Sequence, residues 1–344
     1  MDGGLMGTAK VTSAVVAARA GVSQSAVSRV FTPGASASQK TAEKVRKAAL
    51  ELGYRPNVLA RAMVSGKSRI IGLVVAYLEN HFYPEALEKL SRSLQERGYH
   101  VLVFMAANTS ENVNEVVEEI LEYQVDGIIA ASVSMSTELT DKCQDAGVPI
   151  VLFNRAKEGS DMSVVTSDNL AGGRKVAEFL LAGKHQKIGY IAGWEGASTQ
   201  RDREAGFVER LAEDGVSLHA REVGNFNLEG AADATRRMFA ADPPDAVFVA
   251  NDHMAFAVMD VLRSELGLRV PEDVSLVAYD DVPTAAWPAY NMTTVRQPAN
   301  RMVAATVDIL LSEINGEAAE PQKVEIDGPL IVRGTARIPE GWKT

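Results

Sequence analysis

The chain has 344 residues, of which 46% are hydrophobic, 23% charged and 6% aromatic, and its formal net charge at pH 7 is −10. The length suits two or three compact domains, and the composition fits neither a wholly disordered chain nor a membrane protein. The longest apolar runs, such as residues 70–78, fall short of the roughly 18 residues that span a bilayer. No membrane-spanning segment is therefore expected.

The sequence holds one cysteine, Cys143, which cannot form an internal disulfide and has no metal-ligating neighbour at useful spacing. A reducing compartment is the natural setting for such a chain. Residues 10–20 superficially imitate a signal peptide, but Thr12, Ser13 and Arg19 interrupt their apolar character. We expect a cytoplasmic protein that carries neither a metal nor a cofactor.

Charge is divided unevenly along the chain. Residues 1–68 hold ten Lys or Arg and three Asp or Glu, whereas residues 69–344 hold 25 basic and 42 acidic residues. A small basic segment joined to a large acidic one is the polarity expected when only the small segment touches a polyanion. At this point the alternative is that basic residues simply decorate an exposed face.

The basic segment has the pattern of three short helices. The first is expected over residues 12–20 and ends at Gly21, whose backbone freedom suits a tight turn. Ser23 is a good cap for the second helix, over residues 24–31. Ser38 can open a third helix, whose apolar stripe covers the first two. This arrangement is typical of a helix-turn-helix.

The second of these helices is amphipathic, with Ala26, Val27 and Val30 on its apolar side. Its other face carries hydrogen-bonding side chains close to the helix start, namely Gln24, Ser25, Ser28 and Arg29. A helix that enters the DNA major groove needs such side chains at that end. For Arg29 taken alone, a solvated charge is the alternative.

The motifs of this segment are residues 20–30 (AGVSQSAVSRV), then Ser38 and Thr41, then residues 52–57 (LGYRPN) and Ala60-Arg61. Together they resemble the headpiece of the LacI/GalR (lactose-repressor) family of transcriptional regulators. The resemblance implies that Gln24, Ser25 and Arg29 face base edges, and that Ser23 and Ser28 approach phosphates or the helix start. Arg can bond a guanine and Gln an adenine through two hydrogen bonds, each pair contributing about 1–3 kcal/mol of discrimination.

Two positions of the first helix depart from the family pattern. Ser13 stands where the family usually has an apolar residue, and Val15 stands where it commonly has Asp. We expect the first helix to be capped or packed somewhat differently, with no base-reading position affected.

Residues 57–68 are expected to form a hinge helix and linker. Asn57, which follows a proline, can cap a helix of about two turns, and so short a helix is unstable alone in water. Asn57 and Arg61 belong to the stretch that matches the family and are expected at the DNA. By position, Met63 corresponds to the family's leucine that is wedged into a minor-groove step from each of two paired hinge helices. Packing within the helix is the alternative role for Met63.

After Arg69, strand-like apolar runs alternate with helix-length amphipathic segments, which predicts parallel sheets with helices on both faces. The expected strands are residues 70–78, 100–105, 127–131, 149–153, 187–192, 246–250 and 274–279, and the clearest helices are residues 85–97, 170–182, 252–266 and 301–314. One large sheet or two lobes would fit this pattern. The resemblance implies two lobes like those of periplasmic sugar-binding proteins, behind an all-α headpiece.

The expected domains follow from this organisation. Residues 1–56 form the helix-turn-helix headpiece, residues 57–68 the hinge, and residues 69–344 the effector-binding and dimerisation domain. Lobe 1 spans about residues 69–165 and 296–326, and lobe 2 about residues 166–289 and 329–344, so the chain crosses between the lobes three times.

In open parallel sheets, ligands bind beyond the carboxyl ends of the strands. The residues that follow the expected strands alternate aromatic rings with carboxylates, amides and arginines, a mixture that suits a polyhydroxylated small molecule. With family motifs such as residues 203–207 (REAGF) and 279–282 (YDDV), this points to Phe82, Tyr83, Asn154, Arg203, Phe226, Asn251, Asp280 and Trp287. Trp287 is included for its neighbourhood alone, and helix capping is the alternative role for Asp168 and Asn169.

The sequence therefore predicts a homodimeric transcription regulator, a repressor, that binds a pseudo-palindromic double-stranded operator under control of a small effector. A sugar or sugar derivative is favoured, and a purine is the other effector class. The alternative is a periplasmic-type solute-binding protein, which would share the fold of residues 69–344 but would not need the helix-turn-helix headpiece. An oxidoreductase would need a glycine fingerprint that is missing, and no catalytic motif supports an enzyme.

Overall fold

The computed structural model describes residues 11–31, 35–55, 67–106, 110–133, 137–156, 159, 161–318 and 320–342. The chain divides into two compact units, residues 1–69 and 70–344. Within the described ranges, every helix is too short or too polar to cross a membrane. We refer to the first unit as the headpiece and to the second as the body.

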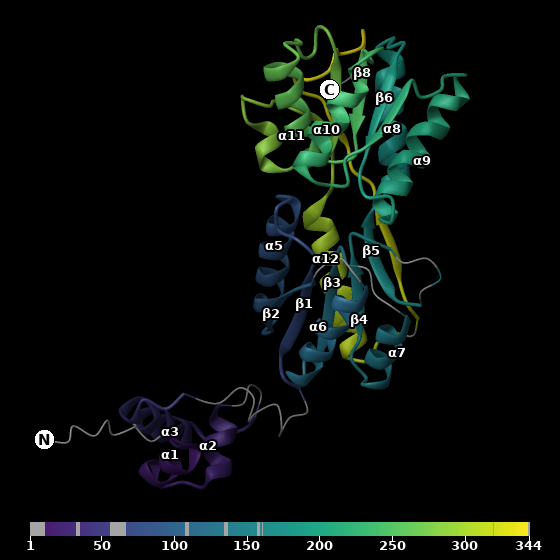
Figure 1. Ribbon diagram of the computed structural model, residues 1–344. Coiled ribbons are helices and arrows are strands. Elements are labelled where there is room, and N and C mark those ends of the chain that lie inside the picture. The colour runs from purple at the N-terminus through teal and green to yellow at the C-terminus, as the bar shows by residue number, and fades with distance from the viewer. Residues whose placement is uncertain are drawn as a thin grey trace, which may run out of the picture. The chain divides into compact units, whose positions relative to one another are not determined.

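In its described residues the headpiece contains three helices, α1 (Ser13–Ala20), α2 (Gln24–Phe31) and α3 (Gln39–Leu52) (Figure 1). Gly21 ends α1 with φ of 65°, a left-handed conformation that a side chain disfavours, and its N–H bonds back into α1. Ser38 caps α3 by accepting the Thr41 N–H at 3.2 Å. The predicted helix-turn-helix is confirmed.

The headpiece core is small. Val16, Val27 and Val45 contribute one fully buried side chain from each helix, and Ala17, Ala48 and Ala49 fill the space between them. Gln24, Ser25 and Arg29 of α2 stay exposed beside this core, which is the arrangement that a DNA-contacting helix requires.

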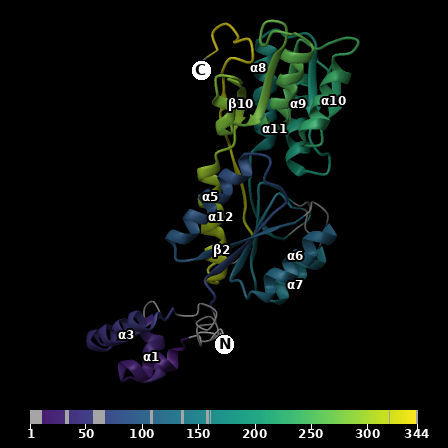
Figure 2. The ribbon, with the colours of Figure 1, turned by 60° about the vertical axis from the view of Figure 1, so that its left-hand side comes forward.

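Lobe 1 of the body is built on a six-stranded sheet in the order β11-β5-β4-β3-β1-β2. Its strands are β1 (Ile70–Val75), β2 (His100–Met105), β3 (Gly127–Ala131), β4 (Ile150–Phe153), β5 (Ser163–Ser167) and β11 (Lys323–Ile326). Figure 2 shows α5 (Phe82–Glu96) and α12 (Ala299–Ile314) on one face of this sheet, and α6 (Ser110–Glu122) and α7 (Thr137–Asp145) on the other.

Lobe 2 has a second six-stranded sheet, in the order β12-β10-β9-β8-β6-β7. Its strands are β6 (Ile188–Ala192), β7 (Ala220–Val223), β8 (Ala246–Val249), β9 (Ser275–Asp280), β10 (Thr293–Arg296) and β12 (Leu330–Ile331). Its helices are α8 (Asn169–Ala182), α9 (Ser198–Glu213), α10 (Leu228–Met238) and α11 (Asp252–Asp260), with a π-helical turn at Val261–Glu265 and a 3-10 turn at Pro283–Ala286. Figure 1 shows α8 and α9 on one side of this sheet and α10 and α11 on the other.

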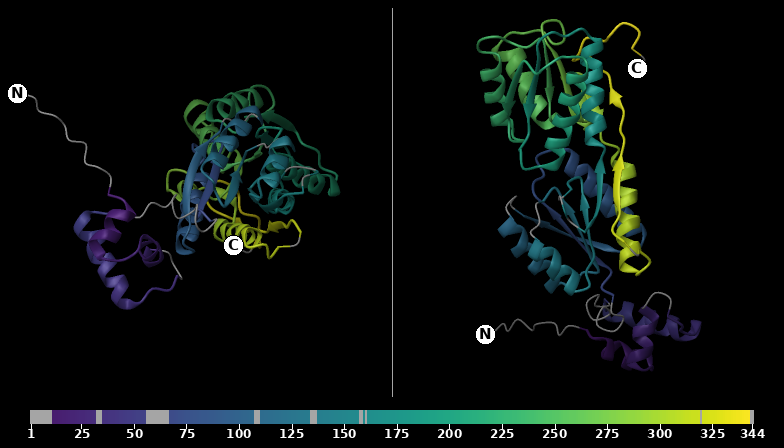
Figure 3. Two further views of the ribbon diagram at one scale, coloured as in Figure 1. Left: turned by 90° about the horizontal axis from the view of Figure 1, so that it is seen from below. Right: turned by 90° about the vertical axis from the view of Figure 1, so that its right-hand side faces the viewer.

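The chain passes between the two lobes three times. It leaves the first sheet after β5, returns from β10 through α12, and leaves again between β11 and β12. The last passage is the yellow C-terminal segment that runs from one lobe to the other in Figure 3. All described strand pairs are parallel except β10 with β12, which is antiparallel. The two lobes with mostly parallel sheets covered on both faces confirm the predicted fold class.

The structure adds strands that apolar runs do not reveal. β7 and β11 are partly exposed and carry charged side chains, and β5 and β10 contain threonines that lie buried between neighbouring strands. All seven predicted strands are confirmed with small shifts at their ends, the largest in the first, which stops at Val75 rather than residue 78. The expectations for Asn57, Arg61 and Met63 fall outside the described residues.

Candidate DNA-reading surface and effector cleft

The DNA-facing residues predicted in the headpiece lie at the start and along the outer face of α2. Gln24, Ser25 and Arg29 are exposed, while Ser28 is half-buried. Ser23 precedes the helix and its Oγ accepts the Ala26 N–H at 3.3 Å, so it acts as the cap that its position predicts. The three residues assigned to base edges thus stand where a groove-entering helix presents its side chains.

Two of the three residues assigned to base edges, Gln24 and Ser25, have side chains that contact polar neighbours. Gln24 Nε2 donates to Ser13 Oγ at 2.9 Å, and the hydroxyls of Ser23 and Ser25 lie 3.0 Å apart. The first contact joins the N-terminus of α1 to that of α2.

In the body, the residues around the predicted effector site converge on a small, nearly closed polar cavity of about 10 Å³ between the lobes. Six of the eight predicted residues line it: Tyr83, Asn154, Arg203, Phe226, Asn251 and Asp280. The first two come from lobe 1 and the others from lobe 2. Sequence reasoning therefore finds most of the lining, although effector contact itself stays a prediction.

The position of Arg203 depends on an unusually close crossing of α8 and α9. A Cβ atom on Gly173 would lie 2.1 Å from the Arg203 carbonyl oxygen, and one on Gly206 would lie 2.0 Å from the Leu170 carbonyl oxygen. Only glycine tolerates backbones this close. Gly173 therefore serves helix packing, and Gly172 leaves room for the Tyr279 ring.

Arg203 is buried and fixed on every side. Its Nε donates to Asn169 Oδ1 at 2.9 Å, its Nη1 donates to the Ala250 carbonyl at 2.6 Å, and its Cζ lies 3.7 Å from the centre of the Tyr279 ring. Its Nη2 is 3.5 Å from an Asp280 carboxylate oxygen. Such a guanidinium offers a rigid, pre-oriented donor edge to the cavity.

Asp280 connects both lobes and the passage between them. It accepts hydrogen bonds from Asn80 of lobe 1 at 3.2 Å and from Gln297, next to α12, at 2.7 Å, and it faces Arg203 of lobe 2. Its φ of 126° is a strained backbone conformation of the kind that structures hold at functional sites. Burial raises the pKa of Asp280, and the Arg203 charge opposes that rise.

A second carboxyl, Asp252, supports this corner without reaching the cavity lining. It is fully buried and accepts the Val282 N–H at 2.9 Å and the Thr294 hydroxyl at 2.7 Å. Burial, followed by the nearby Asp280 carboxylate, raises its pKa well above 3.8. These bonds fix the turn that follows β9 and so fix Asp280.

On the lobe 1 side, Asn154 and Tyr83 are linked. Asn154 Nδ2 donates to Tyr83 Oη at 3.0 Å, and that hydroxyl also contacts Ser132 Oγ. Asn154 Oδ1 is buried and has no hydrogen-bond partner among the described atoms. An acceptor left in this state suits a hydroxyl or N–H donor from a ligand.

Four lining residues were missed as effector-site candidates: Tyr77, Asn80, Arg155 and Thr199. Tyr77 lies beyond the end of β1, because the first strand is shorter than its apolar run suggests. Arg155 Nη1 donates to the Ser132 carbonyl at 2.9 Å, and its Cζ lies 5.5 Å from the centre of the Trp194 ring across the lobes. Arg155 comes shortly after the expected strand at residues 149–153, so the rule that ligands bind beyond strand ends places it near the site. No feature of the sequence marks Thr199.

Two predicted residues lie elsewhere. Phe82 is buried against Phe153 and lines a separate cavity toward α12. Trp287 is 58% exposed and does not contribute to the lining. Its prediction rests on sequence neighbourhood alone, and the 3-10 turn at Pro283–Ala286 separates it from the end of β9.

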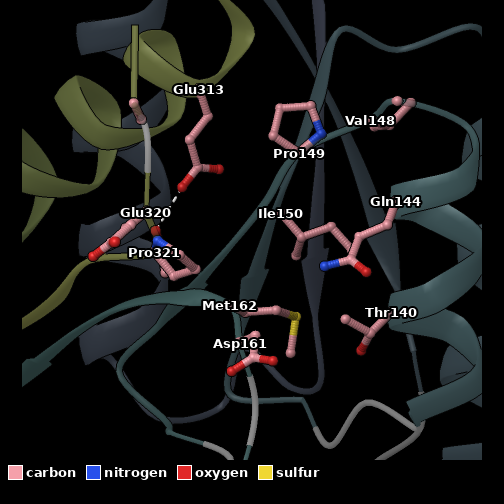
Figure 4. Close-up of a pocket in the computed structure, with 13 residues that line it drawn as sticks. Thr140, Gln144, Val148, Pro149, Ile150, Asp161, Met162, Glu313, Glu320 and Pro321 are labelled. Carbon is pink, nitrogen blue, oxygen red and sulfur yellow. Dashed lines mark hydrogen bonds between the residues drawn. The ribbon is translucent and has the colours of Figure 1, made fainter. Parts of the chain in front are cut away.

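A larger cavity of about 300 Å³ lies at the opposite end of the lobe 1 strands, at the N-terminal ends of β4 and β5 (Figure 4). Glu313 in its wall accepts a hydrogen bond from Ser163 Oγ at 2.5 Å. Although this cavity is larger, it lies within one lobe and at the amino ends of its strands, whereas open parallel sheets bind ligands at the carboxyl ends. The smaller cleft, where both lobes contribute buried polar groups, therefore remains the candidate effector site.

The comparisons with known proteins agree with this architecture. Residues 15–57 match the family described as "Bacterial regulatory proteins, lacI family", and residues 177–336 match the "Periplasmic binding protein-like domain". The transcriptional regulator CelR of Thermobifida fusca is 34% identical over 335 residues, covering 94% of this chain and 97% of CelR. The chain belongs to the LacI family. It is therefore a sequence-specific DNA-binding regulator of the repressor type, controlled by a small effector.

Further LacI-family proteins align over most of their length. The repressor PurR of Vibrio vulnificus (strain CMCP6) is 29% identical, covering 94% of this chain and 97% of PurR. The solved CelR–cellobiose complex has a TM-score of 0.71 and 31% identity, covering 94% of this chain and 99% of that one. The lac repressor dimer bound to operator and the anti-inducer ONPF has a TM-score of 0.85 and 28% identity, covering 94% and 98%.

Proposed function

We propose that α2 reads operator bases through Gln24, Ser25 and Arg29, with Ser23 and Ser28 toward the backbone and the helix start. Support comes from the exposure of the three readers and from the cap formed by Ser23. Asn57, Arg61 and Met63 complete the proposed DNA contacts in the hinge. A solved relative is a dimer on its operator, and two-fold pairing doubles the few bases that one helix can read. We assign the same homodimeric state to this chain.

The proposed effector is a small polyhydroxylated molecule, a sugar or sugar derivative. The cavity combines three aromatic rings that can contact C–H faces (Tyr77, Tyr83 and Phe226) with polar groups that can share hydroxyl groups. These polar groups are Arg203, Asp280 and the three amides of Asn80, Asn154 and Asn251. Asn251 Oδ1 already caps α11 by accepting the Met254 N–H at 2.9 Å, so its Nδ2 is the group proposed to reach the ligand. CelR, a relative of 31% identity, has been solved with cellobiose.

The proposed control operates through Asp280. The Asp280 carboxylate accepts hydrogen bonds from Asn80 of lobe 1 and from Gln297 beside α12. It also lies 3.5 Å from Nη2 of Arg203 in lobe 2. A ligand that takes over some of these bonds changes the relative free energy of lobe arrangements, and it acts only through its different affinity for each. The hinge at residues 57–68 is proposed to convert that change into altered operator affinity. The position of Asp280 is the observation that carries this proposal.

The remaining assignments follow from this function. Residues 1–56 are the proposed DNA-binding headpiece and residues 69–344 the effector-binding and dimerisation domain, with lobe boundaries near 165, 296, 326 and 329. Because its target is operator DNA, we place the protein in the cytoplasm and regard it as a regulator without enzymatic activity.

A thermal-shift screen of the full-length protein tests the effector class. A molecule that binds the native state raises the apparent melting temperature. Sugars, sugar acids and purines are compared on the wild type and on Asp280→Asn. We expect a sugar to raise the melting temperature of the wild type, with a smaller rise in the variant. Stabilisation by a purine alone would contradict the sugar assignment, and an equal rise in both proteins would remove Asp280 from the site.

A further inference from the structure

The N-termini of α1 and α2 are tied together by one side-chain contact. Gln24 Nε2, at the first position of α2, donates to Ser13 Oγ, at the first position of α1, over 2.9 Å. The two helices are held in register by the buried Val16 and Val27 and by the Gly21 turn, where the Val22 N–H bonds to the Ala17 carbonyl at 3.1 Å. The Ser13 hydroxyl is therefore a fixed acceptor for an otherwise exposed glutamine.

This contact sets which hydrogen-bonding groups Gln24 can present. The amide has one acceptor oxygen and two N–H donors. With one N–H bound to Ser13, the side chain keeps Oε1 and a single N–H, a matched acceptor and donor pair. Adenine shows the complementary pair, the N6–H donor and the N7 acceptor, in the major groove. Guanine shows two acceptors, N7 and O6, and would require both N–H groups of Gln24.

We propose that Ser13 is a specificity-determining positioning residue, which orients the Gln24 amide so that α2 selects adenine over guanine at one operator base pair. The proposal rests on the proposed base-reading role of Gln24. Ser13 occupies a position at which the family resemblance leads one to expect an apolar side chain, which cannot form this bond. Holding a rotamer-rich side chain in place before binding also reduces the ordering cost on the DNA.

The test uses the full-length protein and an operator sequence obtained by selection from random duplexes. Gln24→Ala first identifies the base pair that Gln24 reads. Ser13→Thr and Ser13→Val then form a matched pair, because their side chains have the same shape and differ in the hydroxyl. We expect Ser13→Val to lower the adenine-to-guanine affinity ratio at that base pair about 2- to 10-fold. Ser13→Thr should retain the wild-type ratio, and binding to random DNA should stay equal in both variants.

A combined variant separates positioning from direct contact. In the Gln24→Ala background, Ser13→Val should change no base preference further. The inference is overturned if Ser13→Val keeps the wild-type ratio, acts at another base pair, or remains effective without Gln24. If Gln24→Ala leaves every base preference unchanged, Gln24 does not read a base, and both that part of the proposed function and this inference are wrong. The three outcomes for Ser13→Val named above overturn only the inference and leave the proposed function unaffected.

Discussion

The headpiece and the effector cleft recognise their targets with polar side chains in opposite environments. On α2, Gln24, Ser25 and Arg29 stand exposed above a core of a few valines and alanines. In the cleft, Asn154, Arg203 and Asp280 are each at most 3% exposed and are bonded to other protein groups.

The difference follows from the size of the two targets. A DNA duplex brings its own extended, hydrated surface to the protein, so the reading side chains need reach and little burial. A small molecule must be surrounded, and a few pre-oriented polar groups in a dry site give it specificity. The same types of residue therefore serve two kinds of recognition, and substitutions in the two regions should fail in different ways.

The largest expected effect concerns the stability of the body, at the close crossing of α8 and α9. Gly173→Ala places a methyl group 2.1 Å from the Arg203 carbonyl, and we expect it to lower the free energy of unfolding of the body by about 3 kcal/mol. Chemical denaturation followed by tryptophan fluorescence measures this loss. Gly183→Ala is the control, since φ there is −72° and the nearest neighbour is the His185 side chain at 3.1 Å. Equal stability of the two variants would show that the α8–α9 crossing can relax.

Asp280→Asn tests the cleft side of the comparison. The substitution keeps the shape but weakens the charged hydrogen bonds of this site, so we expect effector affinity to fall by about 1.5–3 kcal/mol. Unliganded operator affinity should stay near that of the wild type. Calorimetry with the effector found by thermal shift measures the first quantity, and Asp214→Asn on the surface is the control. Unchanged ligand affinity in Asp280→Asn would remove this carboxyl from the site.

Arg29→Ala tests the headpiece side. If Arg29 reads a base edge, its loss should weaken operator binding by about 1–3 kcal/mol and relax the preference at one base pair. Arg46→Ala removes the same charge from an exposed position on α3 and should alter no base preference. Competition binding on single-base operator variants makes the comparison. Equal weakening of Arg29→Ala on operator and random DNA would contradict base reading.

The smallest expected effect concerns pH and the buried Asp252. Because its pKa is raised above 3.8 in the folded state, the folded protein keeps a proton that the unfolded chain has released. The free energy of unfolding should therefore fall as pH rises from about 4 through the raised pKa. Asp252→Asn should flatten that fall by up to about 1.4 kcal/mol per pH unit, as denaturation across pH can measure.

Asp273→Asn provides the opposite control for this pH effect. Hydrogen bonds from Arg269 lower the pKa of Asp273 to about 2. The contribution of Asp273 is therefore present above its unfolded pKa and is lost as pH falls from about 4 toward 2. If both variants showed the same pH profile as the wild type, burial of Asp252 would have no energetic consequence.

Fold class and much of the cleft could be predicted because local signals were strong there. Apolar strands such as Ile188–Ala192 are fully buried, and polar residues at their carboxyl ends necessarily meet at one edge of the sheet. The cap role of Asp168 was also readable, and its side chain accepts the Ala171 N–H at 2.9 Å.

What could not be predicted depends on distant contacts. Asn80 reaches Asp280 across 200 positions of sequence, and His81 reaches Thr284 at 2.9 Å. The bond from Gln24 to Ser13 likewise depends on the angle between two helices, which periodicity does not encode. Trp287 shows the converse error, because closeness in sequence to a strand end did not bring it into the cleft.

The central claim is that exposed headpiece side chains choose the DNA sequence, whereas the buried cleft decides when it is bound. Selection from random duplexes with the full-length wild type and with Asp280→Asn, each with and without effector, tests it most directly. We predict that both proteins enrich the same two-fold symmetric sequence and that the effector changes enrichment more for the wild type than for Asp280→Asn. Failure of the wild type to enrich any sequence, or enrichment of a different sequence by Asp280→Asn, would contradict the claim.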